Sequence, residues 1–561
     1  MNDAKAVFFV YGIPALLLGS LFCLATGAAL HDAPTYDEPL HITAGYAILS
    51  RGSYWIDTAL PPVTRVMEAL PLLFLPLSLD TSSPAWVNRR RYDAADRFVF
   101  HNTVNAEQIV LCGRFVSILV SMGLGVLLWT WTRDHFDTFA AHAALFFYVF
   151  SPPVLAHAHL ATTDIGFAFF LVLSLVAAEK ACDDHRLSSM ALAGACVALC
   201  ITSKVSGLVL LPVLGVLFLV KKSPDVSWTQ TVKTASVFAL AAVFTGAAVY
   251  RFNHIGAFFD GLRIISRTVG AGRPVFLLGT VRTHGSLLYF LIAIAIKSGL
   301  GFLLALAFAW LCQNSQRSFL LLWIYLPCAA LFIAASCSNL QAGIRYVLPL
   351  YPLLCVPIGG WATSAWRARG WPRVALAASA LWVASATALA YPNYISYFNE
   401  SIGGSSRGIY YLGESNLDWG QELKSLGRYL DDINIRHIYL SYFGSADPLA
   451  YGIRYEAVAP VSNVDRLTDA PKALPQLKAE PRQLFAISAT NLQGIYYKDP
   501  DLFLWLRKRR PLAVFGDSLY VYDLTGDPNA HRQLSNLFLY AGLPALANDE
   551  RQWASTLTKS P

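Results

Sequence analysis

Apolar runs long enough to cross a lipid bilayer recur through the first two thirds of this chain. A membrane helix needs about 20 apolar residues. Runs of this kind predict about eleven such helices, near 8–30, 108–131, 138–156, 164–181, 189–203, 205–220, 233–251, 286–312, 318–337, 346–364 and 374–391. After residue 391 the pattern becomes that of an ordinary soluble protein. We therefore predict a polytopic α-helical membrane domain over 1–391 and a separate domain over 392–561.

The carboxyl-terminal domain alternates strand and helix patterns. Segments rich in β-branched and aromatic residues predict strands at 437–444 and 483–491 and a hairpin of 512–515 with 519–524. The pattern over 419–430 predicts a helix, with Asp418 as its cap and Gln421 completing a capping box. A helical tail follows near 531–558. Together these elements predict a small α/β domain.

Composition and charge orient the chain in a membrane. Hydrophobic residues make up 55% of it and charged residues only 14%, with a mean hydropathy of +0.45. Basic residues of the short loops, such as Lys221, Lys222 and Arg367, fall on one side if the spans alternate, and such an excess marks the cytoplasm. The 31–107 loop and the 392–561 domain then face the other way. The net charge of +7 is explained by these loops, so we expect no nucleic-acid partner.

Cysteines and short motifs exclude several classes of protein. All nine cysteines lie at or before Cys355, so the 392–561 domain has no disulfide framework. The sequence contains no P-loop, dinucleotide fingerprint or zinc-ligand spacing. A nucleotide-driven enzyme is therefore not expected.

The first loop carries two adjacent acids, Asp37 and Glu38, at the outer mouth of the first predicted span. Ionised carboxylates are costly near hydrocarbon unless they face water or take part in chemistry. Further along the loop, an apolar stretch around Pro61-Pro62 is too short and too Pro-broken to span, which favours helices lying in the membrane interface. The 31–107 loop is therefore the first candidate for an active site at the membrane surface.

Other charged residues recur at the same outer face. Asp164 opens a predicted span, where it is either a helix cap or a site residue. Lys204 and Arg345 stand at span ends, where they either snorkel to the interface or bind an anion. Five arginines crowd the outer 252–285 loop, so either the topology differs there or they face an anionic ligand: Arg251, Arg263, Arg267, Arg273 and Arg282. Two acids and several cations on one face fit a lipid-phosphate substrate.

Taken together, these motifs resemble bacterial GT-C glycosyltransferases, and by pattern most of all the protein O-mannosyltransferases and the lipid A aminoarabinose transferases. The resemblance covers roughly residues 8–391. The motifs that carry it are Asp37-Glu38, Pro61-Pro62, Ala161-Thr162-Thr163-Asp164, Ser203-Lys204, Gly343-Ile344-Arg345-Tyr346, Tyr397-Phe398-Asn399 and the stretch from Ser415 to Gln421.

The resemblance implies transfer of a sugar from a polyprenyl-phosphate carrier to an acceptor at the outer face of the bacterial inner membrane. It implies a catalytic group of Asp37, the base, with Glu38 and Asp164. It assigns the donor phosphate to Lys204, Arg282, Arg345 and Tyr346. Candidates for the acceptor or for holding the loops are His41, Arg65, His159, Asn416, Asp418, Trp419 and Gln421. A single displacement would invert the anomeric centre, with the active site and the carboxyl-terminal domain facing the periplasm.

One departure and two alternatives stay open. Related proteins often carry a histidine before the proline pair, whereas Leu60 stands here, so a divalent metal is left undecided. A transporter or flippase of an anionic lipid-linked sugar would use the same outer cations. A surface-binding domain anchored by the spans is the other alternative, although about eleven spans exceed what anchoring requires. The sequence does not identify the sugar, the acceptor or the length of the carrier.

Overall fold

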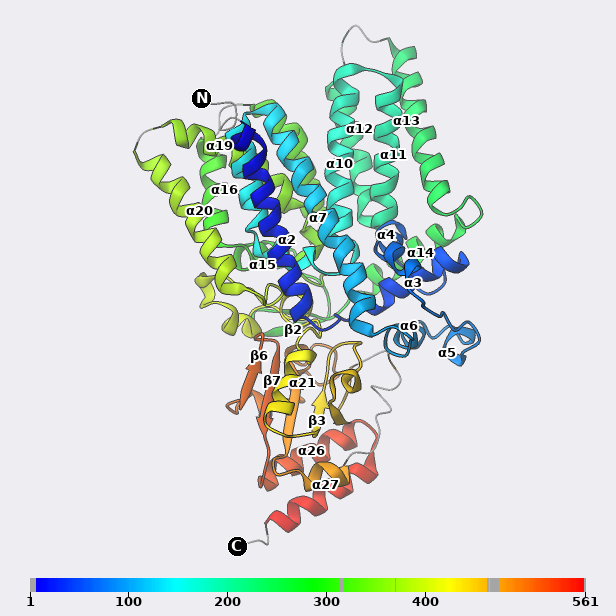
Figure 1. Ribbon diagram of the computed structural model, residues 1–561, viewed down its shortest axis with the longest axis vertical. Helices are drawn as coiled ribbons and strands as arrows, with labels where there is room; N and C mark the ends of the chain where they lie inside the picture. The colour runs from blue at the N-terminus through cyan, green and yellow to red at the C-terminus, as the bar shows by residue number, and fades with distance from the viewer. Residues whose placement is uncertain are drawn as a thin grey trace.

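The computed structural model describes residues 7–558, apart from 223, 225, 226, 313–315, 369, 462, 463 and 465–473. A helical bundle fills the upper part of Figure 1, and an α/β part lies below it. The bundle contains α2 (Ile13–His31), α7 (Ala106–His135), α8 (Thr138–Val149), α9 (Pro152–Ala158), α10 (Thr163–Asp184), α11 (Leu187–Ser203), α12 (Leu210–Val220), α13 (Trp228–Val249), α15 (Tyr289–Lys297), α16 (Leu300–Cys312), α18 (Leu326–Ser336), α19 (Leu350–Arg367) and α20 (Trp371–Ala390).

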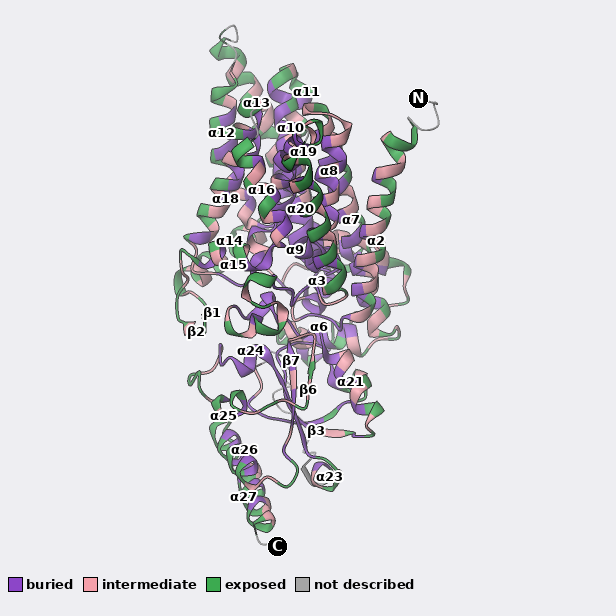
Figure 2. Cartoon of the chain, turned by 90° about the vertical axis from the view of Figure 1, so that its left-hand side faces the viewer, coloured by how far each residue is buried: buried purple, intermediate pink, exposed green. Residues whose placement is uncertain are grey.

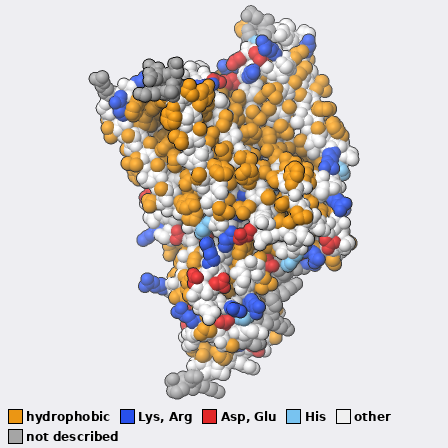
Figure 3. Space-filling model, in the orientation of Figure 1, with side chains coloured by type: hydrophobic (Ala, Val, Ile, Leu, Met, Phe, Trp, Pro, Cys, Tyr) orange, Lys and Arg blue, Asp and Glu red, His pale blue; other side chains and the backbone are white. Residues whose placement is uncertain are grey.

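Several of these helices are suited to a bilayer. Among the described residues, six helices are long and apolar enough to cross a membrane, or up to eight if the bent pairs α8–α9 and α15–α16 each form one span. Each of the eleven predicted ranges contains helix, but the number of crossings stays a prediction. Apolar side chains cover the middle of the bundle in Figure 3, and charged ones gather at its upper and lower ends and over the α/β part. The chain is therefore a multi-pass membrane protein.

Burial separates the centre of the bundle from its outer faces. Helix α10 is largely buried, whereas α13 contributes no buried residue. Leu240, Val243 and Phe244 of α13 are all more than 60% exposed. Figure 2 shows this contrast between a buried centre and exposed outer helices. Exposed apolar faces of this kind suit contact with lipid.

Short helices of the first loop lie at the lower right end of the bundle in Figure 1, at the level where the α/β part begins. They are α3 (Glu38–Arg51), α4 (Val63–Ala69), α5 (Pro84–Val87) and α6 (Arg91–Phe100). The helix α14 (Gly256–Ala271) and a hairpin of β1 (Val275–Leu277) with β2 (Thr280–Arg282) come from the 252–285 loop. Beyond α4, Leu70, Leu73 and Phe74 expose apolar side chains. Such exposure suits the interfacial position predicted for this stretch, which stays a prediction.

The α/β part is built on one mixed five-stranded sheet in the order β4-β3-β5-β7-β6. The strands are β3 (His437–Ser441), β4 (Arg454–Ala457), β5 (Leu484–Ser488), β6 (Ala513–Phe515) and β7 (Leu519–Asp523). Side chains alternate between the two faces of a strand. One face packs against α21 (Leu423–Asp432), and the other packs against α26 (Pro528–Tyr540) and α27 (Pro544–Leu557). The sheet is therefore covered on both sides.

Several elements differ from the sequence-based predictions. The predicted strand at 483–491 ends at Ser488, where α24 (Ala489–Leu492) begins, and β4 was not predicted. The predicted tail helix is two helices separated at Gly542, whose φ of 76° ends the first. The predicted helix at 419–430 begins only at Leu423, and the predicted capping box is wrong because the Asp418 and Gln421 side chains bond elsewhere.

Candidate active site

Two cavities meet at the boundary between the bundle and the α/β part. The first, of about 380 Å³, has apolar walls from α14 and α18, including Ile264, Val269 and Leu331, and a charged end. The second, of about 390 Å³, is lined mainly by aromatic and charged side chains from the first loop and the α/β part. Four residues line both cavities: Asp37, Tyr92, Arg273 and Arg345. We call them the shared wall.

Asp37 is the acid of the shared wall. Its Oδ2 accepts a hydrogen bond from Arg345 Nη1 at 2.9 Å, and its side chain remains 25% exposed. Burial raises the pKa of Asp37, but the charges of Arg345 and His41 outweigh this effect and hold the pKa below its usual value. Oδ1 has no hydrogen-bond partner among the described residues. Asp37 is therefore an ionised carboxylate with one oxygen free to accept a proton.

A second acid lies at the charged end of the first cavity. Asp164 Oδ1 accepts from Lys204 Nζ at 2.5 Å, and Arg345 Nη1 lies 4.0 Å from its Oδ2. The Lys204 ammonium also lies 4.7 Å from the centre of the Tyr346 ring. All four side chains line the first cavity. Asp164 therefore belongs to a charged site rather than serving only as a cap, and Lys204 points into the cavity rather than snorkelling.

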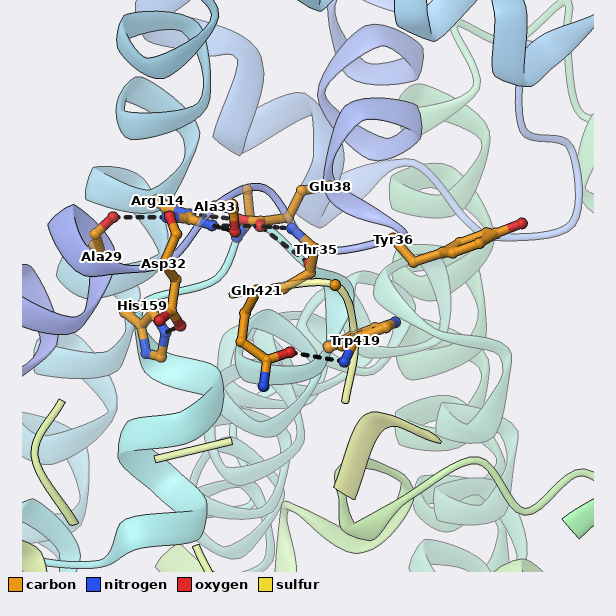
Figure 4. Close-up of polar contacts among 12 residues, drawn as sticks. Ala29, Asp32, Ala33, Thr35, Tyr36, Glu38, Arg114, His159, Trp419 and Gln421 are labelled. Atoms are coloured by element: carbon orange, nitrogen blue, oxygen red, sulfur yellow. Dashed lines mark hydrogen bonds and ion pairs between the residues drawn. The ribbon is translucent and has the colours of Figure 1, made fainter. Parts of the chain in front are cut away.

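Glu38, the neighbour of Asp37, lines neither cavity. It is fully buried, and Arg114 of α7 donates to its two oxygens from Nε at 2.8 Å and from Nη2 at 2.7 Å. Arg114 Nη1 also donates to the carbonyl groups of Ala29 and Asp32, as Figure 4 shows. Because both oxygens are occupied, Glu38 holds the turn that presents Asp37, and its predicted catalytic role stays a prediction.

Replacing Arg114 by methionine should destabilise the folded protein by about 3–5 kcal/mol, because a buried carboxylate loses its counter-charge. The measurement is the thermal unfolding of detergent-solubilised protein. The double variant Glu38→Gln with Arg114→Met removes the unpaired charge and should recover part of the loss. Arg263→Met, at an exposed ion pair with Asp260, is the control and should change little. Equal stability of Arg114→Met and Arg263→Met would show that the buried pair does not hold the turn.

Main-chain hydrogen bonds tie this turn to the α/β part. Ala33 N donates to the carbonyl of Gln421 at 2.8 Å, and Tyr36 N donates to that of Trp419 at 2.9 Å. The Gln421 side chain accepts from Trp419 N at 2.7 Å, a bond drawn in Figure 4. The Gln421 side chain therefore shapes this segment, and its predicted acceptor role stays a prediction. Asp37 follows directly after the tied residues.

The segment before Arg345 is held in a similar way. Asn416 Oδ1 accepts from Ile344 N at 2.9 Å, and its Nδ2 donates to Tyr289 at 2.8 Å. Gly343 has a φ of 102°, a backbone conformation that favours glycine. Asn416, a predicted acceptor candidate, is buried and lines neither cavity. It holds the backbone directly before Arg345, and its predicted role toward the acceptor stays a prediction.

Asp418 is buried at the junction with the sheet. Its Oδ2 accepts from Thr490 N at 2.9 Å, and its Oδ1 accepts from Gly420 N at 3.2 Å. Burial outweighs these bonds and raises the pKa of Asp418 to about 7. Folding therefore favours the protonated acid, so the stability it contributes is present at acidic pH and is lost as pH rises through about 7.

Asp418→Asn should flatten this pH dependence, because the amide cannot ionise. Between pH 5 and pH 8 we expect the free energy of unfolding of the wild type to fall relative to that of the variant by about 2–3 kcal/mol, which lowers its melting temperature. Thermal unfolding across this range measures the difference. A constant gap between the two proteins at every pH would contradict the assignment.

Three further predicted site residues lie outside both cavities. Arg282 is exposed on β2 and lines neither cavity, and its predicted contact with the phosphate stays a prediction. His159 is buried, with its ring between Asp32 and the carbonyl of Leu155. Arg65 is buried against Asp57 at 3.0 Å. By contrast, the predicted His41 and Trp419 line the first and the second cavity, respectively.

Some cavity residues were not among the predicted site residues. Arg273 appeared only as one of five loop arginines, yet it lines both cavities. Tyr92 and Glu414 carried no signal in the sequence, because no motif marks them and only the fold brings them to the site. Glu414 accepts from the Tyr496 hydroxyl at 3.0 Å. The second cavity is therefore largely a product of tertiary structure.

A group of side chains that could hold a metal ion lies outside the two cavities. Among the described residues, one group of three His, Cys, Asp or Glu side chains has its ligand atoms close together, namely His31, Asp32 and Glu422. None of the three lines either cavity. Asp37 and Asp164 do not belong to such a group, and each instead faces a cation.

The residues of the shared wall combine a proton acceptor with fixed positive charges. An ionised carboxylate with a free oxygen stands between an apolar cavity with a cationic end and a polar, aromatic cavity. Cations in a partly enclosed site stabilise negative charge that develops on a leaving group, and a carboxylate can take a proton from an attacking hydroxyl. The geometry therefore suits displacement of an anionic lipid group by a polar nucleophile.

Comparison with known proteins supports the predicted resemblance. Residues 107–249 match the family model described as dolichyl-phosphate-mannose-protein mannosyltransferase. This match confirms that the chain resembles the protein O-mannosyltransferase group of glycosyltransferases. Among curated proteins, no sequence matches this chain.

Three solved structures illustrate what the fold of this chain is similar to. ArnT from Cupriavidus metallidurans bound to undecaprenyl phosphate has 15% identity and a TM-score of 0.49, covering 94% of this chain and 99% of its own. The Archaeoglobus fulgidus oligosaccharyltransferase has 12% identity and a TM-score of 0.43, covering 88% and 71%. The Saccharomyces cerevisiae Pmt1-Pmt2 complex bound to the sugar donor has 16% identity and a TM-score of 0.30, covering 48% and 40%.

Proposed function

We propose that this chain is a membrane glycosyltransferase of the GT-C class that transfers a sugar from a polyprenyl-phosphate donor to an acceptor hydroxyl. The observation that carries the proposal is the shared wall, where Asp37 and Arg345 pair at 2.9 Å and line both cavities. The family match over residues 107–249 supports the same class. The active site and the α/β domain face the periplasm of a bacterial inner membrane in this proposal.

The first cavity is the proposed site of the donor. Its apolar walls suit a polyprenyl chain, and its charged end contains Lys204, Arg273 and Arg345 near Asp164. The guanidinium of Arg345 has no hydrogen-bond partner at Nη2 among the described residues. Arginine can bind a phosphate through two parallel hydrogen bonds. The lipid phosphate therefore lies beside Arg345 in the proposed complex.

The second cavity is the proposed site of the acceptor. Tyr36, Phe443 and Tyr496 form a stack there, with ring centres 5.2 Å and 5.6 Å apart. Trp419 completes the aromatic lining and lies 4.3 Å from the Arg345 guanidinium. A polar group presented from this side reaches the free Oδ1 of Asp37.

The proposed reaction is a single displacement. The acceptor oxygen forms a bond to the anomeric carbon while the bond from that carbon to the phosphate oxygen breaks. The hydroxyl proton passes to Asp37, and the polyprenyl phosphate leaves with its negative charge beside the cations. One such step inverts the anomeric centre. No covalent intermediate on the protein is required.

The direct test is transfer by the purified protein in lipid nanodiscs, offered a panel of polyprenyl-phosphate sugars together with membrane extract as the acceptor source. We expect one donor to release polyprenyl phosphate and to label an acceptor. Movement of an intact donor across proteoliposomes, with no release of polyprenyl phosphate from any donor, would instead indicate a transporter.

If the second cavity binds the acceptor, a substitution there should change the KM for the acceptor but not the binding of polyprenyl phosphate. Tyr496→Ala should raise the KM for the acceptor by about tenfold, because a stacked ring and its bond to Glu414 are lost. Binding of polyprenyl phosphate should be unchanged, since the lipid binds in the other cavity. Tyr410→Ala, an exposed tyrosine outside both cavities, is the matched control. Loss of lipid binding in Tyr496→Ala would contradict the assignment.

A further inference from the structure

A second cluster of ionisable groups lies where the bundle meets the α/β part, outside both cavities. His31 ends α2 and Asp32 follows it, while Glu422 immediately precedes α21. One ligand atom from each of the three side chains lies within 4.8 Å of the others. Residues almost 400 positions apart in the sequence thus bring a His-Asp-Glu donor set together.

The two carboxylates of the cluster are buried. Asp32 is 3% exposed and Glu422 is 2% exposed. Glu422 Oε1 has no hydrogen-bond partner among the described residues. The adjacent Gly516 provides no side chain, and a Cβ atom there would collide with this oxygen. A buried carboxylate oxygen without a donor is costly, and a nearby like charge adds to the cost.

Asp32 is oriented by two histidines. Its Oδ1 lies 3.1 Å from His31 Nδ1, and its Oδ2 lies 3.0 Å from His159 Nε2. The other nitrogen of His159 bonds the carbonyl of Leu155 at 2.6 Å. Outer hydrogen bonds of this kind orient the ligands in metal sites. His31 is 23% exposed, so the cluster has a route to solvent.

We propose that His31, Asp32 and Glu422 bind a divalent transition-metal cation of the Zn²⁺ type, which links the outer end of the first membrane helix to the α/β domain. One imidazole and two carboxylates are common ligands of such ions, at about 2.0–2.2 Å. The cation neutralises the two buried carboxylates and supplies the missing partner of Glu422. Solvent beside His31 completes the coordination. The proposal is independent of the glycosyltransferase activity.

The test is calorimetric titration of the chelator-treated, full-length protein with Zn²⁺. We expect one tight site in the wild type and a higher melting temperature when it is filled. His31→Ala and Glu422→Gln should each weaken binding at least 100-fold and abolish the thermal shift. His159→Gln, which changes only an outer contact, should weaken binding by about 10–100-fold.

A matched control is His437→Gln, at a histidine that pairs with Glu480 at 2.8 Å outside this cluster. It should bind Zn²⁺ as the wild type does. Size-exclusion profiles of the metal-free variants establish that they fold, and His31→Ala tests the site even if Glu422→Gln does not fold. Unchanged Zn²⁺ affinity in a folded His31→Ala protein, or no tight site in the wild type, would overturn the proposal.

Discussion

Asp37→Asn should lower the rate of sugar transfer by about 10²–10⁴-fold while leaving donor binding largely intact, because an amide keeps the shape of the side chain but cannot accept the proton. The carboxylate it replaces has one oxygen on Arg345 and the other free. Binding of polyprenyl phosphate and single-turnover transfer are measured separately on the same preparation.

Asp80→Asn provides the control for Asp37→Asn, since it makes the same chemical change at an acid of the first loop that lines neither cavity. It should transfer sugar at the wild-type rate. Near-normal turnover in Asp37→Asn would remove Asp37 from the role of base, whereas loss of donor binding would make its contact with Arg345 structural.

Arg345 gives the second large effect. Its Nε donates to the carbonyl of Ala342 at 3.1 Å, and its Nη1 donates to Asp37. Arg345→Ala should lower kcat/KM by about 10²–10³-fold, because the leaving phosphate loses a fixed cation. Arg345→Lys should retain part of the activity and still fall about tenfold, because a point charge cannot form two parallel hydrogen bonds.

The comparison with Arg282→Lys makes the Arg345 result specific. Arg282 was a further candidate for the phosphate from the sequence, after Arg345 and Lys204, and it is exposed on β2 outside both cavities. We expect no change in donor affinity or rate for Arg282→Lys. If Arg345→Lys also left donor affinity and rate unchanged, snorkelling to the membrane interface would better explain why an arginine stands at position 345.

The charged centre of the site could be predicted because membrane helices make charges rare. Asp37, Asp164, Lys204 and Arg345 stood out against apolar surroundings, and the structure brings all four to the end of one cavity. The same reasoning could not separate Glu38 from Asp37. Their difference is a tertiary one, since Arg114 lies 76 positions away from Glu38.

The roles of the later motif residues were harder to predict. Asp418 and Gln421 have the residue types and spacing of a helix cap, but the chain turns instead of entering a helix. The Asp418 side chain accepts from the backbone of Thr490, and that of Gln421 accepts from Trp419 N in its own segment. The α/β elements followed the alternation of apolar residues, whereas β4 is short and has no distinct pattern of its own. Local sequence therefore predicted the helices and strands better than it predicted the hydrogen-bond partners of individual side chains.

The two main-chain hydrogen bonds donated by Ala33 and Tyr36 link the helical bundle to the α/β part. Composition divides the chain near residue 391, but the turn that presents Asp37 is held by hydrogen bonds from residues on the other side of that division. Because these bonds use backbone atoms, most substitutions at the four residues concerned leave them intact, and the two sides can vary in sequence without losing their alignment. Under the proposed function, the helical bundle taken alone would lack one edge of the turn that presents Asp37, because residues 419–421 supply that edge.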